Sequence, residues 1–282
     1  MKLKNLLNYL LENVDEGALR GFSLDILKKK MPEFEKYGYP ESIGRQIRNL
    51  VDGQYKLPYM GVGSSRIVYA LSTGKVLKIA LNDKGVAQNQ AEHEVSRDPS
   101  LKYIGARVYE TDPNYYWSVM EVAKIYESST DLKLDLGIPK NLSERWNYEI
   151  RKAIEDLRSI YNLGYNVEDV IERRYDSDDL GDGDPDFDED KEAFRKFLEN
   201  PPKGLLALVD LTDTGLGGHS LEMGDIVTDH FGKTADGRPV LIDYGFTTGV
   251  AEGYYRSDSN SYGSPPPSSI MSQDEEEDVL FV

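Results

Sequence analysis

Residues 61–80 read GVGSSRIVYALSTGKVLKIA, and this stretch decides the fold. The residue period over Arg66–Leu71 and again over Lys75–Ala80 is closer to the two of a strand than to the roughly 3.6 of a helix. The intervening Ser72-Thr73-Gly74 contains a glycine, as short turns between strands often do. The pattern therefore predicts a β-hairpin.

The segments around this hairpin indicate helices before it and mixed elements after it. Residues 1–53 carry apolar stripes at helical spacing, and the second of three expected helices should end near Pro32, which lacks a backbone N–H. After the hairpin we expect a polar helix over 84–97, a strand over Tyr115–Val122, a long amphipathic helix over Leu142–Leu163, a helix over Leu205–Leu211 and a short buried strand over Val240–Ile242.

These patterns divide the chain into four segments. Residues 1–53 are expected to be a helical segment, residues 54–123 a small lobe with an antiparallel sheet, and residues 124–252 a mainly helical lobe with an acidic loop at 175–190. Residues 253–282 are rich in Ser, Pro, Gly and acidic residues, which predicts a disordered acidic tail. The predicted fold class is α+β with two lobes.

The acidic charge of the chain is concentrated in two stretches. The 282 residues carry a formal net charge of −17, of which Tyr175–Asp190 contributes −9 and Arg256–Val282 contributes −5. The rest is close to neutral, which argues against nucleic-acid binding but leaves a local nucleotide pocket open. The acidic loop or the acidic tail could dock a basic protein partner.

Cysteine and histidine usage excludes several kinds of site. The absence of Cys excludes a disulfide scaffold, a Cys-ligated zinc site and a Cys nucleophile, and three His are too few for a His-rich metal site. No run of about 18 apolar residues is present, and Met1–Gly17 lacks the uninterrupted apolar region of a signal peptide. We therefore expect a protein of the reducing cytoplasm with no membrane association.

Alternating acids in the predicted loop are reminiscent of a calcium-binding loop. Asp182, Asp184, Asp186, Asp188 and Asp190 recur at every second position. However, Phe187 stands where the sharp turn of such a loop needs Gly, and Ala193 stands where the bidentate Glu belongs. We therefore expect a solvated acidic loop.

Two features near the hairpin are typical of phosphate chemistry. Gly61 and Gly63 allow backbone N–H groups to approach a phosphate closely, although a plain turn explains them equally well. Lys78 lies between apolar neighbours in a strand, where it either reaches water at a sheet edge or pairs with a phosphate and an acid. The helix that follows offers Glu92 and Glu94 as that acid.

A third feature lies further along the chain. Asp225 is followed five residues later by His230, and Asp243 comes thirteen residues after His230. Asp243 ends an apolar strand and precedes Tyr244 and Gly245. A carboxylate in this position is well placed to hold a metal ion.

Together these motifs resemble the protein-kinase-like superfamily. The glycine loop, Val-Leu-Lys, a helical Glu, an Asp-containing loop and Asp-aromatic-Gly occur in the family's order, and the last three positions have the spacing of typical protein kinases. Gly63–Arg66, Gln88-Asn89 and Leu241–Gly245 are most similar to small atypical kinase-fold proteins encoded by bacteriophages. The resemblance covers roughly residues 55–250 and implies a two-lobed protein-kinase-like fold with a reduced helical lobe.

The resemblance also implies a role for each matching residue. Lys78 would contact the α- and β-phosphates and pair with Glu92, and Asp225 would accept the proton of the attacking hydroxyl. The implied nucleotide-binding residues are Gly61, Gly63, Ser64, Lys78, Glu92, Met120, Glu121 and Val122, with Met120 guarding the adenine pocket. Asp243 and His230 would bind the metal, and the implied cofactors are ATP and Mg²⁺ or Mn²⁺.

The sequence departs from the family pattern at several of these places. His230 stands where the second metal ligand is usually Asn, Arg66 replaces the third glycine of the loop, Met223-Gly224 replaces the usual His-Arg, and Tyr244 replaces Phe. No Ala-Pro-Glu motif follows Gly245, so we expect the helices that dock peptide substrates in protein kinases to be missing.

Three functions are compatible with the sequence. The first is an ATP- and Mg²⁺-dependent phosphotransferase acting on a hydroxyl of a protein, its own tail included, or of a small molecule. The second is a catalytically impaired pseudokinase serving as a phage structural or host-interaction adaptor, in the host cytoplasm or the virion. The third is a mixed α/β domain in which the motif order is a coincidence, and it predicts that Lys78 and Asp243 lie far apart.

Overall fold

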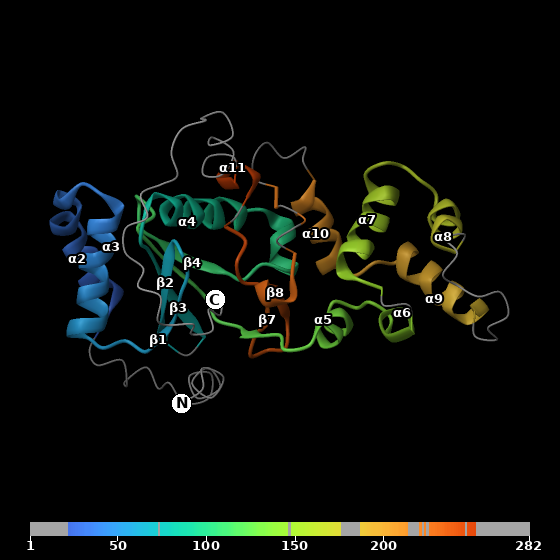
Figure 1. Ribbon diagram of the computed structural model, residues 1–282, viewed down its shortest axis with the longest axis horizontal. Coiled ribbons are helices and arrows are strands. Elements are labelled where there is room, and N and C mark those ends of the chain that lie inside the picture. The colour runs from blue at the N-terminus through green and yellow to red at the C-terminus, as the bar shows by residue number, and fades with distance from the viewer. Residues whose placement is uncertain are drawn as a thin grey trace, which may run out of the picture. The chain divides into compact units, whose positions relative to one another are not determined.

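The computed structural model describes most of the chain between Phe22 and Ala251 (Figure 1). The described ranges are 22–72, 74–145, 148–175, 187–213, 220–221, 223, 226–245 and 247–251. They divide into two compact units. The first, here the sheet unit, takes in the described parts of Met1–Val95, Arg107–Val122 and Asp243–Val282, and the second, the helical unit, those of Ser96–Ala106 and Ala123–Ile242.

These units do not follow the predicted domain boundaries residue for residue. Residues 96–106 group with the helical unit, and the described residues from Asp243 onward group with the sheet unit. The boundaries at 53, 123 and 252 stay a prediction, and the predicted disordered tail lies outside the described residues.

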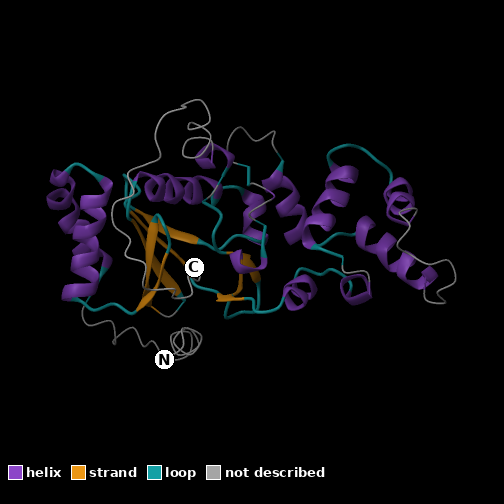
Figure 2. Cartoon of the chain, in the orientation of Figure 1, coloured by secondary structure: helices purple, strands orange, loops and turns teal. Residues whose placement is uncertain are grey.

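The sheet unit is built on a five-stranded antiparallel sheet (Figure 2). Its strands are β1 (Tyr59–Val62), β2 (Arg66–Ser72), β3 (Lys75–Ala80), β4 (Val108–Thr111) and β5 (Trp117–Glu121), in the order β1-β2-β3-β5-β4. Gly74 has φ +81° in the turn between β2 and β3, where a residue with a Cβ would be strained. The predicted hairpin and the strand predicted over 115–122 are confirmed, as is the α+β class.

Helices cover this sheet at two places. The polar helix predicted over 84–97 is α4 (Asp83–Val95), which packs across β3, β5 and β4 (Figure 1). Before the sheet come α2 (Leu24–Phe34), a 3-10 turn over Glu35–Tyr37, α3 (Pro40–Arg48) and a π-helical turn over Asn49–Gln54. A short helix, α11 (Thr248–Ala251), contacts α4.

The helix predicted to end near Pro32 continues beyond it. Pro32 lies inside α2, which runs to Phe34 and buries Leu27, Met31 and Phe34. A proline removes one backbone hydrogen bond, but burial of two large side chains next to it favours continuation of the helix. The helix thus ends two residues after Pro32, close to the predicted position.

The helical unit combines a small sheet with six helices in its described residues. The helices are α5 (Ser129–Asp135), α6 (Lys140–Arg145), α7 (Ile150–Tyr161), α8 (Val167–Tyr175), α9 (Phe187–Glu199) and α10 (Lys203–Thr212), with short 3-10 turns at Pro99–Tyr103 and Thr228–His230. The sheet has the order β6 (Lys124–Ile125), β7 (Phe231–Lys233), β8 (Pro239–Leu241). The helix predicted over 205–211 is α10, and the strand predicted over 240–242 is β8.

The single helix predicted over Leu142–Leu163 is wrong, because two helices, α6 and α7, occupy this range. Glu149, just before α7, has extended backbone angles (φ −87°, ψ 152°). The break places the buried Tyr148 ring edge-on to Phe194, with ring centroids 5.3 Å apart, and lets its hydroxyl donate to Asp156 at 2.7 Å. Tertiary packing of Tyr148 thus overrides the helical periodicity of the sequence.

The predicted solvated acidic loop is only partly within the described residues. Residues 176–186 lie outside them, and Phe187 begins α9. Asp190 is buried in the first turn of α9, where it accepts a hydrogen bond from Asn141 Nδ2 at 2.5 Å. The solvated loop is therefore the wrong description for Asp190.

No helix among the described residues has the length and apolarity needed to span a membrane.

Helices α3 and α4 both approach the end of β3 at Ala80 through glycines. A Cβ added to Gly44 would lie 2.2 Å from the Ala80 carbonyl oxygen, and one added to Gly85 would lie 3.1 Å from the Ala80 Cβ. No atom outside its immediate surroundings lies within 4 Å of a Cβ built on Gly53. Glycine at 44 and 85 therefore sets how closely the two helices approach the sheet.

We expect Gly44→Ala to destabilise the protein by about 1–3 kcal/mol, because the helix must move away from a backbone carbonyl. Gly53→Ala is the matched control and should change stability by less than about 1 kcal/mol. Urea unfolding followed by circular dichroism measures both. Equal unfolding midpoints for the two variants would show that α3 does not need this close approach.

Candidate functional site

Lys78 and Glu92 form a buried ion pair between strand and helix. Lys78 lies on β3, opposite Val68 on β2 and Ser118 on β5, and Glu92 lies on α4. The Lys78 Nζ is 2.9 Å from Glu92 Oε1, and the two side chains are 3% and 0% exposed. The pairing implied by the kinase resemblance is therefore present, and Lys78 is not an edge-strand lysine reaching water.

Arg66 joins this pair to Asp243. It lies at the start of β2, and its side chain is 6% exposed. Its Nη1 is 2.8 Å from Glu92 Oε1, and its Nη2 is 2.7 Å from Asp243 Oδ1. A longer contact of 3.4 Å joins Nη1 to Asn89 Oδ1. Two cations and two carboxylates thus form one cluster within the sheet unit, called here the Arg66 cluster.

Sequence reasoning missed Arg66 as a site residue. It noted Arg66 only as a departure from the third glycine of the loop. A signal was present, because Arg66 directly precedes the apolar run Ile67-Val68, as Lys78 stands among apolar residues in the next strand. A cation in an apolar strand rarely stays buried without an anionic partner.

The charges of the cluster shift the pKa values of both cations. Burial lowers the pKa of Lys78; the Glu92 carboxylate opposes this shift and the Arg66 guanidinium adds to it. Burial also acts to lower the pKa of Arg66, but the carboxylates of Glu92 and Asp243 outweigh it and raise that pKa. Arg66 therefore stays charged, whereas Lys78 is the cation that releases its proton more readily than usual.

Glu92 has one oxygen with an unmet hydrogen-bonding capacity. While Oε1 contacts both cations, the buried Oε2 has no hydrogen-bond partner among the described residues. A buried carboxylate oxygen of this kind is costly and attracts any donor that can reach it.

The segment Asp243-Tyr244-Gly245 lies close against α4. A Cβ added to Gly245 would lie 2.6 Å from the Gln88 carbonyl oxygen and 3.0 Å from Glu92 Cγ. Tyr244 is fully buried, and burial raises the pKa of its hydroxyl well above the usual value. Gly245 therefore permits the approach that brings Asp243 to Arg66. The interpretation of the motif order as a coincidence predicted that Lys78 and Asp243 lie far apart, whereas Glu92 and Arg66 link them in one cluster.

The predicted glycine loop is held by α4. The Gly63 amide donates to the Arg66 carbonyl at 2.8 Å, and the Ser64 carbonyl accepts from Asn82 Nδ2 at 3.0 Å. Ser65 is buried and its hydroxyl donates to Gln88 Oε1. Gly61 lies on β1, opposite Val68. The loop that is predicted to cover phosphates is thus fixed at the start of β2, next to Arg66.

The predicted adenine contacts lie at the end of β5. Met120 is buried, and the amides of Glu121 and Val122 donate to the carbonyls of Arg107 and Gly74 at 2.8 and 2.9 Å. Both amides therefore already have acceptors in the protein. Recognition of adenine by Met120, Glu121 and Val122 stays a prediction.

The two remaining predicted site residues are Asp225 and His230. Asp225 lies outside the described residues. His230 belongs to the helical unit, where its carbonyl accepts from the Ile242 amide at 2.8 Å. In the described part of the chain, no group of three or more His, Cys, Asp or Glu side chains is arranged to hold a metal ion. Their catalytic and metal roles stay predictions.

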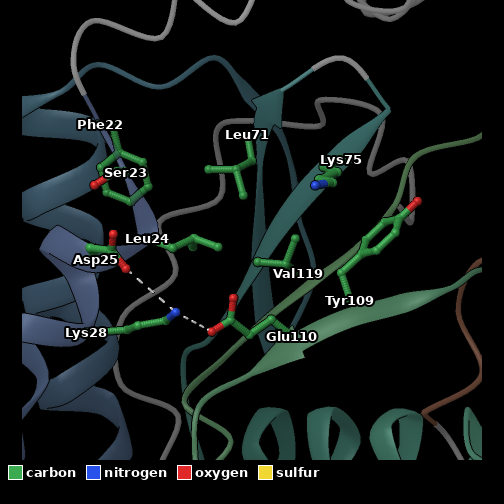
Figure 3. Close-up of a pocket in the computed structure, with 10 residues that line it drawn as sticks. All are labelled: Phe22, Ser23, Leu24, Asp25, Lys28, Leu71, Lys75, Tyr109, Glu110 and Val119. Atoms are coloured by element: carbon green, nitrogen blue, oxygen red, sulfur yellow. Dashed lines mark ion pairs between the residues drawn. The ribbon is translucent and has the colours of Figure 1, made fainter.

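A pocket of about 390 Å³ lies elsewhere in the sheet unit (Figure 3). Leu24, Leu71 and Val119 supply part of its lining, and Lys28 reaches across to Glu110, with Nζ 2.5 Å from Oε1. The hydrogen bond to Glu110 is the main cause of the raised pKa of Lys28. None of the predicted site residues lines this pocket.

Comparison with known proteins finds only limited similarity to this chain. No protein-family model matches the chain, and no curated protein sequence matches it. Two solved structures of APH(2'')-IIa, an aminoglycoside phosphotransferase with a protein-kinase-like fold, are similar. The gentamicin complex has 14% identity and a TM-score of 0.35, and the streptomycin–ATP ternary complex has 14% identity and a TM-score of 0.31. Each comparison covers 72% of this chain and 70% of the other, and likeness of this degree carries no conclusion about site residues or substrate.

We expect Glu92→Ala to lower the free energy of unfolding by about 3–5 kcal/mol, because it leaves two buried cations without their shared carboxylate. Glu94→Ala, on the same helix but partly exposed, should cost less than about 1 kcal/mol. Chemical unfolding of the two variants beside the wild type measures the difference. A Glu92→Ala midpoint equal to that of Glu94→Ala would contradict the assignment of Glu92 as the centre of the cluster.

Proposed function

We propose that the chain is a kinase-like phosphotransferase that binds ATP at the Lys78–Glu92 ion pair and transfers the γ-phosphoryl group to a hydroxyl. The observation that carries this proposal is the buried 2.9 Å contact between Lys78 on a central strand and Glu92 on the following helix, joined through Arg66 to Asp243. The acceptor is a hydroxyl of a small molecule or of a protein, the serines of the tail included.

The chemistry of phosphoryl transfer supports this assignment. Catalysis of this reaction consists largely of holding the phosphates in position and neutralising their charge. Glu92 fixes the Lys78 ammonium on a rigid strand, and the Arg66 guanidinium supplies a second cation 2.8 Å from the same carboxylate oxygen. An approaching phosphate would also oppose the lowered pKa of Lys78 and favour its charged form.

The donor set near Asp243 fits a metal ion only when the nucleotide brings it. Mg²⁺ is usually held by one or two carboxylates together with substrate phosphates and water. Asp243 supplies one carboxylate, 17% exposed, and Arg66 already contacts its Oδ1. A metal held at Asp243 would neutralise phosphate charge.

A second candidate function is favoured by the same Arg66–Asp243 contact. If Arg66 keeps Asp243 from a metal, the chain is a catalytically impaired pseudokinase that binds nucleotide and acts as an adaptor. Its protein partner would dock on the acidic loop or tail, and a phage-encoded adaptor of this kind would work in the host cytoplasm or the virion. Nucleotide binding is common to both candidates.

We expect Lys78→Met to weaken ATP binding at least about tenfold, because it removes the cation that Glu92 holds for the phosphates. Lys196→Met is the control, since the Lys196 side chain is 70% exposed on α9 in the helical unit. Isothermal titration calorimetry with ATP and Mg²⁺ or Mn²⁺ measures both variants beside the wild type. Wild type that binds no ATP with either metal, or equal affinities for the two variants, would contradict the proposal.

We expect Asp225→Asn to slow phosphoryl transfer by about 100-fold or more while ATP affinity stays within about twofold, because the base acts on the acceptor hydroxyl. Asp229→Asn, four residues away, is the matched control. Transfer of labelled γ-phosphate to the protein's own tail or to added hydroxyl compounds is the measurement. Unchanged transfer in Asp225→Asn would remove Asp225 as the base and leave nucleotide binding standing.

A further inference from the structure

Arg66 contacts the carboxylate of Asp243, which the kinase resemblance implies to be a metal ligand. The guanidinium Nη2 lies 2.7 Å from Asp243 Oδ1, a distance typical of a strong charge-assisted hydrogen bond. Asp243 is the only carboxylate of the Arg66 cluster with appreciable exposure, at 17% against 0% for Glu92. The carboxylate best placed for a metal is therefore already neutralised by the protein.

Arg66 is held in this place by more than Asp243. Its Nη1 contacts Glu92 Oε1 at 2.8 Å and Asn89 Oδ1 at 3.4 Å. Its backbone pairs with Ala80 on β3, and its carbonyl accepts from the Gly63 amide. Withdrawing the guanidinium would break a buried ion pair with Glu92 and a part-buried one with Asp243, so Arg66 does not readily give way to an arriving cation.

A divalent ion on Asp243 Oδ1 would lie next to this fixed positive charge. The repulsion between them would be weakly screened, because the Arg66 side chain is only 6% exposed. By contrast, the cluster as it stands is electrically neutral, with Arg66 and Lys78 balancing Glu92 and Asp243. A nucleotide's phosphates therefore meet no net negative charge in the cluster, with or without a metal.

We propose that Arg66 takes the place of a divalent metal ion at Asp243, so that nucleotide binding at this site does not require a metal. The inference rests on the proposed function in one respect, that a nucleotide binds at the Arg66 cluster. It makes Arg66 the residue that determines the metal requirement. Any metal needed for transfer would then have to bind Asp243 after Arg66 releases it.

Removing the positive charge of Arg66 should reverse this property. Arg66→Gln leaves Lys78 facing both carboxylates, so the cluster becomes net negative and repels phosphates until another cation arrives. Arg66→Lys keeps one positive charge and should keep binding independent of metal. Arg195→Gln is the matched control, because Arg195 lies on α9 in the helical unit and pairs there with Glu168 and Glu192.

The experiment is calorimetric titration of the non-hydrolysable analogue AMP-PNP in EDTA, and again in Mn²⁺. Wild type, Arg66→Lys and Arg195→Gln should show dissociation constants that differ by less than about threefold between the two conditions, and Arg66→Gln should bind at least about tenfold more weakly in EDTA than in Mn²⁺. Circular dichroism melting checks that each variant is folded. If Arg66→Gln does not fold, the comparison of wild type and Arg66→Lys in the two conditions decides the proposal.

The outcomes separate this inference from the proposed function. Wild-type binding that is lost in EDTA and recovered in Mn²⁺ would overturn the inference and leave the proposed function standing. Metal-independent binding by a folded Arg66→Gln would overturn the role of Arg66 alone. Absence of AMP-PNP binding under both conditions would overturn the inference and the proposed function together.

Discussion

The buried carboxylate of Glu92 links α4 to strands β2 and β3 and, through Arg66, to Asp243. It is completely buried, and its Oε1 contacts both Lys78 and Arg66, at 2.9 and 2.8 Å. A carboxylate at this depth is tolerable only because two cations from neighbouring strands neutralise it. The same contacts fix α4 against β2 and β3, and through Arg66 they determine where Asp243 lies. Helix, sheet and the Asp-aromatic-Gly segment are thus tied together by one side chain.

The hairpin and the Lys78–Glu92 pair could be predicted from sequence because both are local. The period-two pattern of residues 66–80 and the turn glycine specify the strands, and the acidic partner of Lys78 lies in the next element. Arg66 could not be predicted in the same way. Its partner Asp243 lies 177 residues further along the chain, and the close packing of Gly245 against α4 accompanies the contact between them.

Errors in the helical unit have the same origin. The apolar spacing from Leu142 to Leu163 is that of one helix, but burial of Tyr148 beside Phe194 divides it. Asp190 belongs to an acidic run that suggests solvent exposure, yet Asn141 binds it in the interior. In each case a contact between residues distant in sequence outweighs a local pattern, which sequence reasoning alone does not detect.

The two candidate functions differ in what Arg66 does, and they share one site. A phosphotransferase needs Asp243 to be released to a metal during transfer, whereas an adaptor keeps it paired with Arg66. Both require a nucleotide at Lys78. The central claim is therefore the location of the nucleotide phosphates, and it can be tested without knowing the acceptor.

Labelling with an acyl-phosphate derivative of ATP tests this claim most directly. The reagent acylates the lysine nearest the bound phosphates. The lysine amine attacks the acyl carbon, and ATP is the leaving group. The lowered pKa of Lys78 makes more of its amine available in the nucleophilic, neutral form. Mass spectrometry should find Lys78 as the main acylated lysine, with labelling abolished by excess ATP. Acylation confined to exposed lysines and unaffected by ATP would contradict the placement of a nucleotide at the Arg66 cluster.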